Sequence, residues 1–160
     1  MVKNNSIWFL LSLTLYCGCG NRVMPAPKPP INKNFVTLSS ADADTVSIVG
    51  NLYKGEAPFW TPTNDDIGVL ENALPTYLKS HSPQSGTAVN LANYRRQYFG
   101  CTKNGRKVVF VNAFCGNADE RHKGWRNRIV FVKDGGECCF QVIYDVEKGN
   151  FSSLHYNGYA

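Results

Sequence analysis

The chain has 160 residues, six of them cysteine, and a formal net charge of +5 at pH 7. About 125 residues follow the N-terminal segment described next, which is enough for one domain with one hydrophobic core and too few for two. The three histidines, His81, His122 and His155, have no close spacing with each other or with the cysteines. The sequence therefore predicts no zinc site and no other metal or cofactor.

The first residues are typical of a secretory signal. Lys3 precedes an uncharged, mostly apolar run from Ile7 to Tyr16. This run of about ten residues is roughly half of the ~20 that a membrane-spanning helix needs. We therefore expect the segment to be removed rather than to remain as a permanent span.

Around the expected cleavage position, Tyr16-Cys17-Gly18-Cys19 resembles the bacterial lipobox, in which small residues precede a cysteine that is diacylated and becomes the new N-terminus. We predict a signal peptide over residues 1–18 and lipidation at Cys19; an ordinary secretory signal cut nearby is the alternative. Residues 19–34 contain four of the eight prolines and predict an extended tether. Residues 35–160 then form a single α+β domain.

The domain begins with the weakly alternating segment Val46–Tyr53, which predicts a short β-strand. The next segment predicts an amphipathic helix that starts with a capping-box pattern at Thr63 and Asp66. Apolar residues recur on one face of this helix (Ile67, Leu70, Leu74, Tyr77, Leu78). Pro75 removes a backbone donor inside it, so we expect a kink or a restart there.

From Asn93 onward the apolar period changes to two. The runs NYRRQYFGC and RKVVFVNAFC flank Asn104-Gly105, a strong hairpin signal. RIVFVK and ECCFQVIYD predict a second hairpin, and NFSSLHYNGYA predicts either an edge strand or a segment that crosses the sheet. The predicted fold class is α+β, with one amphipathic, Pro-kinked helix packed on a four-stranded antiparallel sheet.

Several segments, namely LPTYL from Leu74 to Leu78, VNAFC and DGGECCF, resemble the C-terminal half of small exported bacterial lipoproteins of no established activity. The resemblance covers roughly Leu74–Ala160 and implies no catalytic residue. The helix-on-sheet layout is also similar to cystatin-like domains, although the sequence has no inhibitor hairpin of the Gln-x-Val-x-Gly kind.

This resemblance places cysteines at Cys115 and Cys138 and implies a disulfide between them, with Cys139 as a packing residue. The predicted meander argues against the pair, because Cys115 would lie two strands from Cys138 whereas a disulfide needs Cα atoms within ~7 Å. Cys101 is an alternative partner if the sheet curls, and unpaired thiols are equally compatible with the sequence. A bond between Cys138 and Cys139 is disfavoured because it would distort the strand.

Positive charge is concentrated between Arg95 and Lys133, where ten basic residues accompany two acidic ones, Asp119 and Glu120. The pattern predicts a basic surface (Arg95, Arg96, Arg106, Lys107, Arg126, Arg128). We expect no nucleic acid as a partner of an exported protein. Anionic lipid headgroups, an envelope polysaccharide or an acidic protein are the expected partners; charge that only protects the sheet from aggregation is the alternative.

These patterns predict a lipid-anchored, non-enzymatic protein of the bacterial cell envelope that acts as a binding or scaffolding module. A cystatin-like protease inhibitor is the second hypothesis, and it requires a hairpin turn such as Asn104-Gly105 to form one wedge with the N-terminal segment. A cysteine hydrolase is the third, with Cys115, His122 and Asp119 as ingredients. No family signature surrounds that cysteine, so the sequence predicts no catalytic residue.

Overall fold

The computed structural model describes residues 33–83, 85–116 and 122–158. These residues belong to one compact unit, Ile31–Ala160. The predicted signal peptide, the predicted lipidation site Cys19 and most of the predicted tether lie outside the described residues, as does Asp119.

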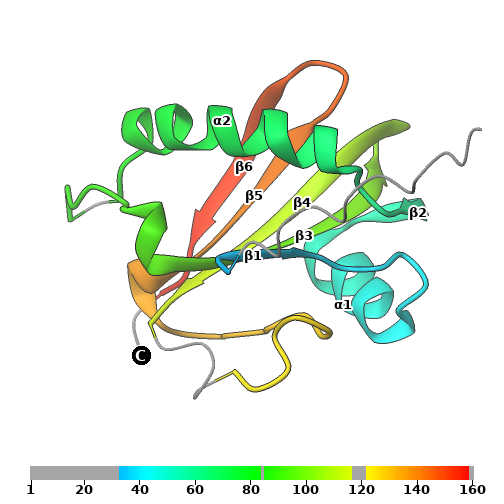
Figure 1. Ribbon diagram of the computed structural model, residues 1–160, viewed down its shortest axis with the longest axis horizontal. Helices are drawn as coiled ribbons and strands as arrows, with labels where there is room; N and C mark the ends of the chain where they lie inside the picture. Colours follow the sequence, from blue (N-terminus) through cyan, green and yellow to red (C-terminus); the bar gives the residue numbers. More distant parts are fainter. Residues whose placement is uncertain (1–32, 84, 117–121, 159–160) are drawn as a thin grey trace, which may run out of the picture. The chain divides into compact units, whose positions relative to one another are not determined.

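Within the described residues, two α-helices accompany a six-stranded sheet (Figure 1). In chain order the elements are β1 (Phe35–Thr37), α1 (Ala43–Tyr53), β2 (Glu56–Trp60), α2 (Asn64–Ser80), β3 (Tyr94–Lys103), β4 (Arg106–Cys115), β5 (Cys139–Asp145) and β6 (Asn150–Tyr156). The strand order is β1-β3-β4-β5-β6, with β2 also paired to β3, and only β1 runs parallel to its neighbour. The α+β class is confirmed, whereas one helix on four strands is wrong in detail.

The hairpin of β3 and β4 turns at Asn104-Gly105, as predicted. Lys103 pairs with Arg106, and both turn residues have positive φ, 50° and 75°, which is the backbone of a two-residue hairpin turn. Near the end of β3, strand β2 crosses so closely that a Cβ on Gly100 would lie 2.4 Å from the carbonyl oxygen of Trp60. Only glycine permits this approach.

The predicted amphipathic helix is α2. Its capping box is confirmed: the Asp66 N–H donates to Thr63 Oγ1 (3.2 Å) and the Thr63 N–H donates to Asp66 Oδ2 (2.9 Å). The helix continues through Pro75 without a restart. Its buried side chains (Ile67, Leu70, Leu74, Leu78) pack on one face of the sheet, against residues such as Tyr98, Val111 and Val142.

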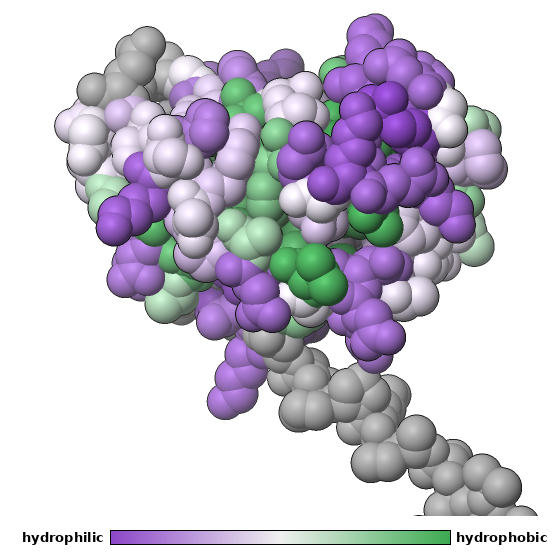
Figure 2. All heavy atoms as spheres, turned by 90° about the horizontal axis from the view of Figure 1, so that it is seen from above, coloured by the Kyte–Doolittle hydropathy of each residue, from purple (hydrophilic) through white to green (hydrophobic). Residues whose placement is uncertain are grey.

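Figure 2 looks onto the face of the domain that α2 covers. Hydrophobic residues form a narrow strip there, with polar residues on both sides. Val69, on the outer side of α2, is 58 % exposed. The opposite side of α2, with its leucines, supplies the apolar contact to the sheet.

The predicted strand over Val46–Tyr53 is wrong, because these residues belong to α1. Asp42 caps this helix by accepting the Thr45 N–H (2.7 Å), and Lys54 ends it in the left-handed conformation. Val46, Val49 and Tyr53 are three to four residues apart and therefore share one helical face. That face packs on the sheet surface opposite α2, against a cluster that includes Phe99 and Phe110 (Figure 1).

The predicted strand RIVFVK is also wrong. Residues 129–132 form no sheet strand, and β5 pairs directly with β4, for example Val111 with Val142. The segment between these strands instead crosses the face of the sheet that α1 also covers (Figure 1). The C-terminal run forms β6, an edge strand, which was one of its two predicted alternatives.

Candidate functional site: a cationic pocket under a docked loop

A disulfide joins Cys115, the last residue of β4, to Cys138, the residue before β5. Their Cα atoms are 5.0 Å apart, because Phe114 pairs with Cys139 in the adjacent strands. The pairing implied by the family resemblance is confirmed. The objection drawn from the predicted meander was wrong because no strand lies between β4 and β5.

The disulfide closes the segment between these two strands into a loop. Its described residues 122–132, here called the docked loop, lie on the sheet. Closure of a loop of this length (sequence separation 23) stabilises the folded chain by about 3 kcal/mol through the lost entropy of the unfolded state. The remaining cysteines of the described chain, Cys101 and Cys139, are free and buried.

Three side-chain amides form a row across the central strands beneath the docked loop. Gln97 in β3, Asn112 in β4 and Gln141 in β5 are register partners, so they lie side by side on one face of the sheet. Asn112 Nδ2 donates to Gln97 Oε1 (3.0 Å), and Gln141 Nε2 donates to Asn112 Oδ1 (3.3 Å). We call this row the amide ladder; it is at most 7 % exposed.

The amide ladder holds the backbone of the docked loop. The Val130 N–H donates to Gln97 Oε1 (2.8 Å), and Asn112 Nδ2 donates to the Val130 carbonyl (2.7 Å). Gln97 Nε2 donates to the carbonyls of Arg128 (2.7 Å) and Trp125. Side chains thus supply the bonds that a neighbouring strand would otherwise make, and the buried backbone groups are satisfied.

Between α1 and the docked loop lies a pocket of about 410 Å³, here called the loop pocket. Apolar side chains form one part of its wall (Ile48, Ile129, Val130, Phe131). Polar and charged residues form the rest (Asp44, Ser47, His122, Lys123, Arg128). Its size and mixed lining are those of ligand-binding pockets in general.

Trp125 gives the docked loop a fixed apolar anchor. It is 3 % exposed and packs edge-on against Phe114, with ring centroids 6.1 Å apart. The Arg126 guanidinium lies 4.3 Å from the centre of the indole ring, and Arg126 Nη2 donates to the Lys33 carbonyl (3.0 Å). The N-terminal end of the described chain therefore touches the docked loop.

Lys123 and Arg128 give the described lining of the loop pocket a net positive charge. Two ion pairs occur in the described part of the chain, Arg96 with Glu71 and Arg106 with Asp145, and neither includes these two cations. Asp44 is the acidic residue of the pocket lining. Phe131, which is 45 % exposed, lines the same pocket, so the pocket combines an apolar ring with two cations.

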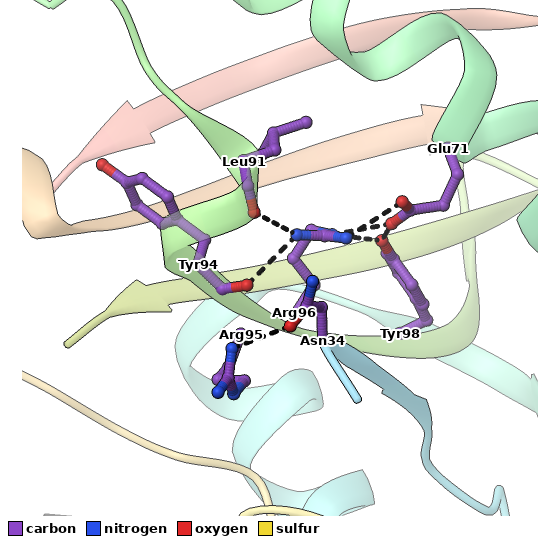
Figure 3. A network of polar contacts seen from close by, with 7 residues as sticks. All are labelled: Asn34, Glu71, Leu91, Tyr94, Arg95, Arg96 and Tyr98. Atoms are coloured by element: carbon purple, nitrogen blue, oxygen red, sulfur yellow. Dashed lines mark hydrogen bonds and ion pairs between the residues drawn. The ribbon is translucent and has the colours of Figure 1, made fainter. Parts of the chain in front are cut away.

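Arg96 does not contribute to the predicted basic surface. Its guanidinium is buried between β3 and α2, where it makes two charge-assisted bonds to Glu71 (2.7 and 3.0 Å) and donates to the Leu91 carbonyl (2.8 Å) (Figure 3). The Tyr98 hydroxyl also donates to Glu71. Side chains of β3 point to alternate faces of the sheet, so Arg96 lies on the face that α2 covers. Its buried charge is stabilised by the Glu71 carboxylate.

The other predicted basic residues lie at both ends of the β3–β4 hairpin and on the docked loop. Arg95 donates to Asn34 Oδ1 (2.8 Å), Arg106 pairs with Asp145 (2.8 Å), and the ammonium of Lys107 lies 5.3 Å from the Trp60 ring. Arg128 lines the loop pocket and Arg126 flanks it through Trp125. Lys123 and the amide ladder are the additional site residues that the sequence prediction did not include.

The structure leaves no thiolate for the hydrolase hypothesis at Cys115, because its sulfur is bonded to Cys138. Burial raises the pKa of the Cys101 thiol to about 11 and also raises the pKa of Cys139. In residues 33–83, 85–116 and 122–158, no group of three or more His, Cys, Asp or Glu side chains is placed to hold a metal ion.

Comparisons of the chain with protein-family models, with curated proteins and with solved structures gave no match. None of the helices described is both long and apolar enough to cross a membrane.

Proposed function

We propose that the protein is a lipid-anchored, non-enzymatic module of the bacterial cell envelope whose loop pocket binds anionic lipid headgroups. The signal-like N-terminus and Cys19 support the anchor, and the disulfide is compatible with an oxidising compartment. The observation that carries the binding site is that two cations outside the ion pairs of the described residues, Lys123 and Arg128, line the same pocket as the half-exposed ring of Phe131. Cations next to an exposed aromatic ring suit the boundary between headgroups and acyl chains.

The position of Lys33 gives this site access to the membrane. Residues 19–34 would connect the anchor to the domain, and their end lies against Arg126 of the docked loop. A tether that reaches the domain at this loop favours the loop, rather than the distant hairpin turns, as the surface that meets the bilayer. We also propose that this chain belongs to the family of exported lipoproteins that its sequence resembles.

The cystatin-like alternative has less support. Its wedge requires the N-terminal segment beside a hairpin turn. Phe35 pairs with Arg96 near the start of β3, whereas Asn104-Gly105 follows the end of the same strand. Seven residues of extended strand separate Arg96 from Lys103, a distance of about 23 Å at ~3.3 Å per residue.

The test is to reconstitute the anchored protein into nanodiscs that contain a spin-labelled headgroup lipid and to record backbone amide spectra. With phosphatidylglycerol we expect amides of residues 123–131 to broaden. Each cation near an anionic surface contributes about 1 kcal/mol, so the double variant Lys123→Gln/Arg128→Gln should weaken the contact on the order of 30-fold.

Lys79→Gln removes an equally exposed cation from α2 and serves as the matched control. It should leave the broadening unchanged. Equal broadening in phosphatidylcholine nanodiscs, or in the double variant, would contradict headgroup binding at the loop pocket.

A further inference from the structure

α1 covers only part of its face of the sheet. On the uncovered part of this same face, next to the end of α1, lies a groove. Two hollows, of about 370 and 310 Å³, share Lys103, Ile143 and Ser153 in their walls, so they lie next to each other. We call the two hollows together the sheet groove. It begins where α1 ends, at Leu52 and Tyr53, and extends toward the β3–β4 and β5–β6 turns.

The two halves of the sheet groove differ in chemistry. The half next to α1 is floored by apolar side chains such as Phe110 and Ile143, and Leu52 at its wall is 52 % exposed. The half near the turns carries amide and hydroxyl side chains (Asn104, Asn150, Ser152, Ser153). Such a surface offers apolar contact at one end and several hydrogen-bonding groups at the other.

Positive charge remains in the polar half. Lys103, Arg106 and Lys148 line it, and Asp145 is its acidic residue. The Asp145 carboxylate is already engaged, since it accepts Arg106 Nε (2.8 Å) and the Lys148 N–H (3.0 Å). In the part of the chain that is described, Lys103 and Lys148 form no ion pair. The charge of Lys148 acts on the Asp145 carboxylate, but three cations and one carboxylate leave this half of the groove net positive.

Ser153, which both hollows share, has an unusual backbone. Its φ is +57°, at a register shift where β6 bulges against the Gln141–Ile143 segment of β5. Glycine or asparagine takes this left-handed conformation at lower cost than serine. The bulge alone would protect an edge strand from aggregation, but it does not require a serine. Ser153 lines both hollows, so a residue with a strained backbone and a hydrogen-bonding side chain lies at the groove, as is common at binding sites.

We propose that the sheet groove binds a short acidic oligosaccharide. Sugar hydroxyls would meet the Ser and Asn side chains, the acidic groups would meet Lys103 and Lys148, and the apolar faces of the sugar rings would contact the exposed Leu52. The groove lies at the end of β3 opposite the β1 contact near Lys33. The proposal therefore rests on a surface separate from the loop pocket.

The test is chemical-shift mapping of the full chain in detergent micelles, titrated with tetragalacturonate. The amides of Lys103, Ile143 and Ser153 should shift, and Lys103→Gln/Lys148→Gln should weaken binding at least about tenfold, because two charge contacts are lost. Ser153→Gly should weaken binding while it keeps or raises the melting temperature, which separates loss of the hydroxyl from misfolding. Lys79→Gln should bind like the unchanged protein.

Three results would overturn the proposal. These are equal shifts with neutral maltotetraose, equal or larger shifts with tetraglutamate, and shifts confined to the loop pocket. Arg128→Gln separates the two sites: it should weaken headgroup contact by about fivefold and retain the oligosaccharide shifts. The spectra therefore distinguish an incorrect proposal for the loop pocket from an incorrect proposal for the sheet groove.

Discussion

Arg96 and Glu71 are the most tightly bound charges of the described domain. The arginine side chain is 5 % exposed and the glutamate side chain 22 % exposed, and both oxygens of the carboxylate accept from the guanidinium. Two carbonyls and the Tyr98 hydroxyl complete the surroundings of Arg96 (Figure 3). A pair of this kind is costly to break because removal of one partner leaves the other charge buried.

Arg96→Met should therefore lower the free energy of unfolding by about 3–5 kcal/mol. The double variant Arg96→Met/Glu71→Leu should recover much of that loss, because no charge remains buried. Urea unfolding at neutral pH measures both values, and Lys79→Met on the outer side of α2 is the control for removal of an exposed charge. A double variant as unstable as the single one would contradict this assignment.

Asp145 gives the domain a predictable response to acid. Burial raises the pKa of its carboxyl, but the hydrogen bond from the Lys148 N–H and the bond and charge of Arg106 together lower the pKa below its ordinary value of 3.8. A lowered folded-state pKa contributes stability that is present above the unfolded pKa and is lost as pH falls through the folded value.

Asp145→Asn should thus be less stable than the unchanged protein at about pH 6, and the difference should shrink at about pH 3 and below. Urea unfolding at a series of pH values measures it. Glu147→Gln, an exposed neighbour, should reproduce the unchanged pH profile. A stability difference that grows toward low pH would show that the sign is wrong.

At the scale of elements, the amide ladder makes the docked loop part of the fold. Gln97→Leu would leave the Val130 N–H and the carbonyls of Trp125 and Arg128 without their partners. Each buried unsatisfied group costs about 1–3 kcal/mol. We expect lower stability and faster hydrogen exchange at the Val130 amide.

Gln141→Leu is the matched comparison. In the described residues Gln141 donates to Asn112, whereas the side-chain bonds to the docked loop come from Gln97 and Asn112. It should cost less and leave exchange at Val130 closer to that of the unchanged protein. Equal exchange rates in the two variants would mean that the ladder does not hold the loop.

The elements that could be predicted from sequence carry local signals. The Thr63 and Asp66 pattern starts α2, and Asn104-Gly105 positions the β3–β4 turn. The segment Val46–Tyr53 was misassigned because its β-branched residues favour a strand, whereas Asp42 four residues earlier and packing on the sheet make it helical. Tertiary contact outweighed propensity there.

The amide ladder shows why the site was harder to predict. Asn112 and Gln141 interrupt apolar strands, as in VVFVNAF and CFQVI, which was a usable signal, whereas Gln97 follows two arginines. The partners become apparent only when the register is known, since Gln97, Asn112 and Gln141 are far apart in sequence. For the same reason residues 128–133 resembled a strand: their backbone bonds go to side chains rather than to another strand.

For the whole molecule, the described domain has two chemically different ends along β3 and β4. The disulfide, the docked loop and Lys33 lie toward one end, and the hairpin turns with the polar half of the sheet groove lie toward the other. In the proposed function the first end contacts a membrane, and the second end stays free for a soluble ligand. The membrane contact of the first end depends on the predicted lipid anchor at Cys19.

The measurement that tests this anchor most directly is metabolic labelling with a palmitate analogue, followed by isolation of the protein from the membrane fraction. If Cys19 is lipidated, we expect label in the unchanged protein and in Cys17→Ala, and loss of both label and membrane fractionation in Cys19→Ala. An unlabelled wild-type chain, or one that keeps its label in Cys19→Ala, would contradict it.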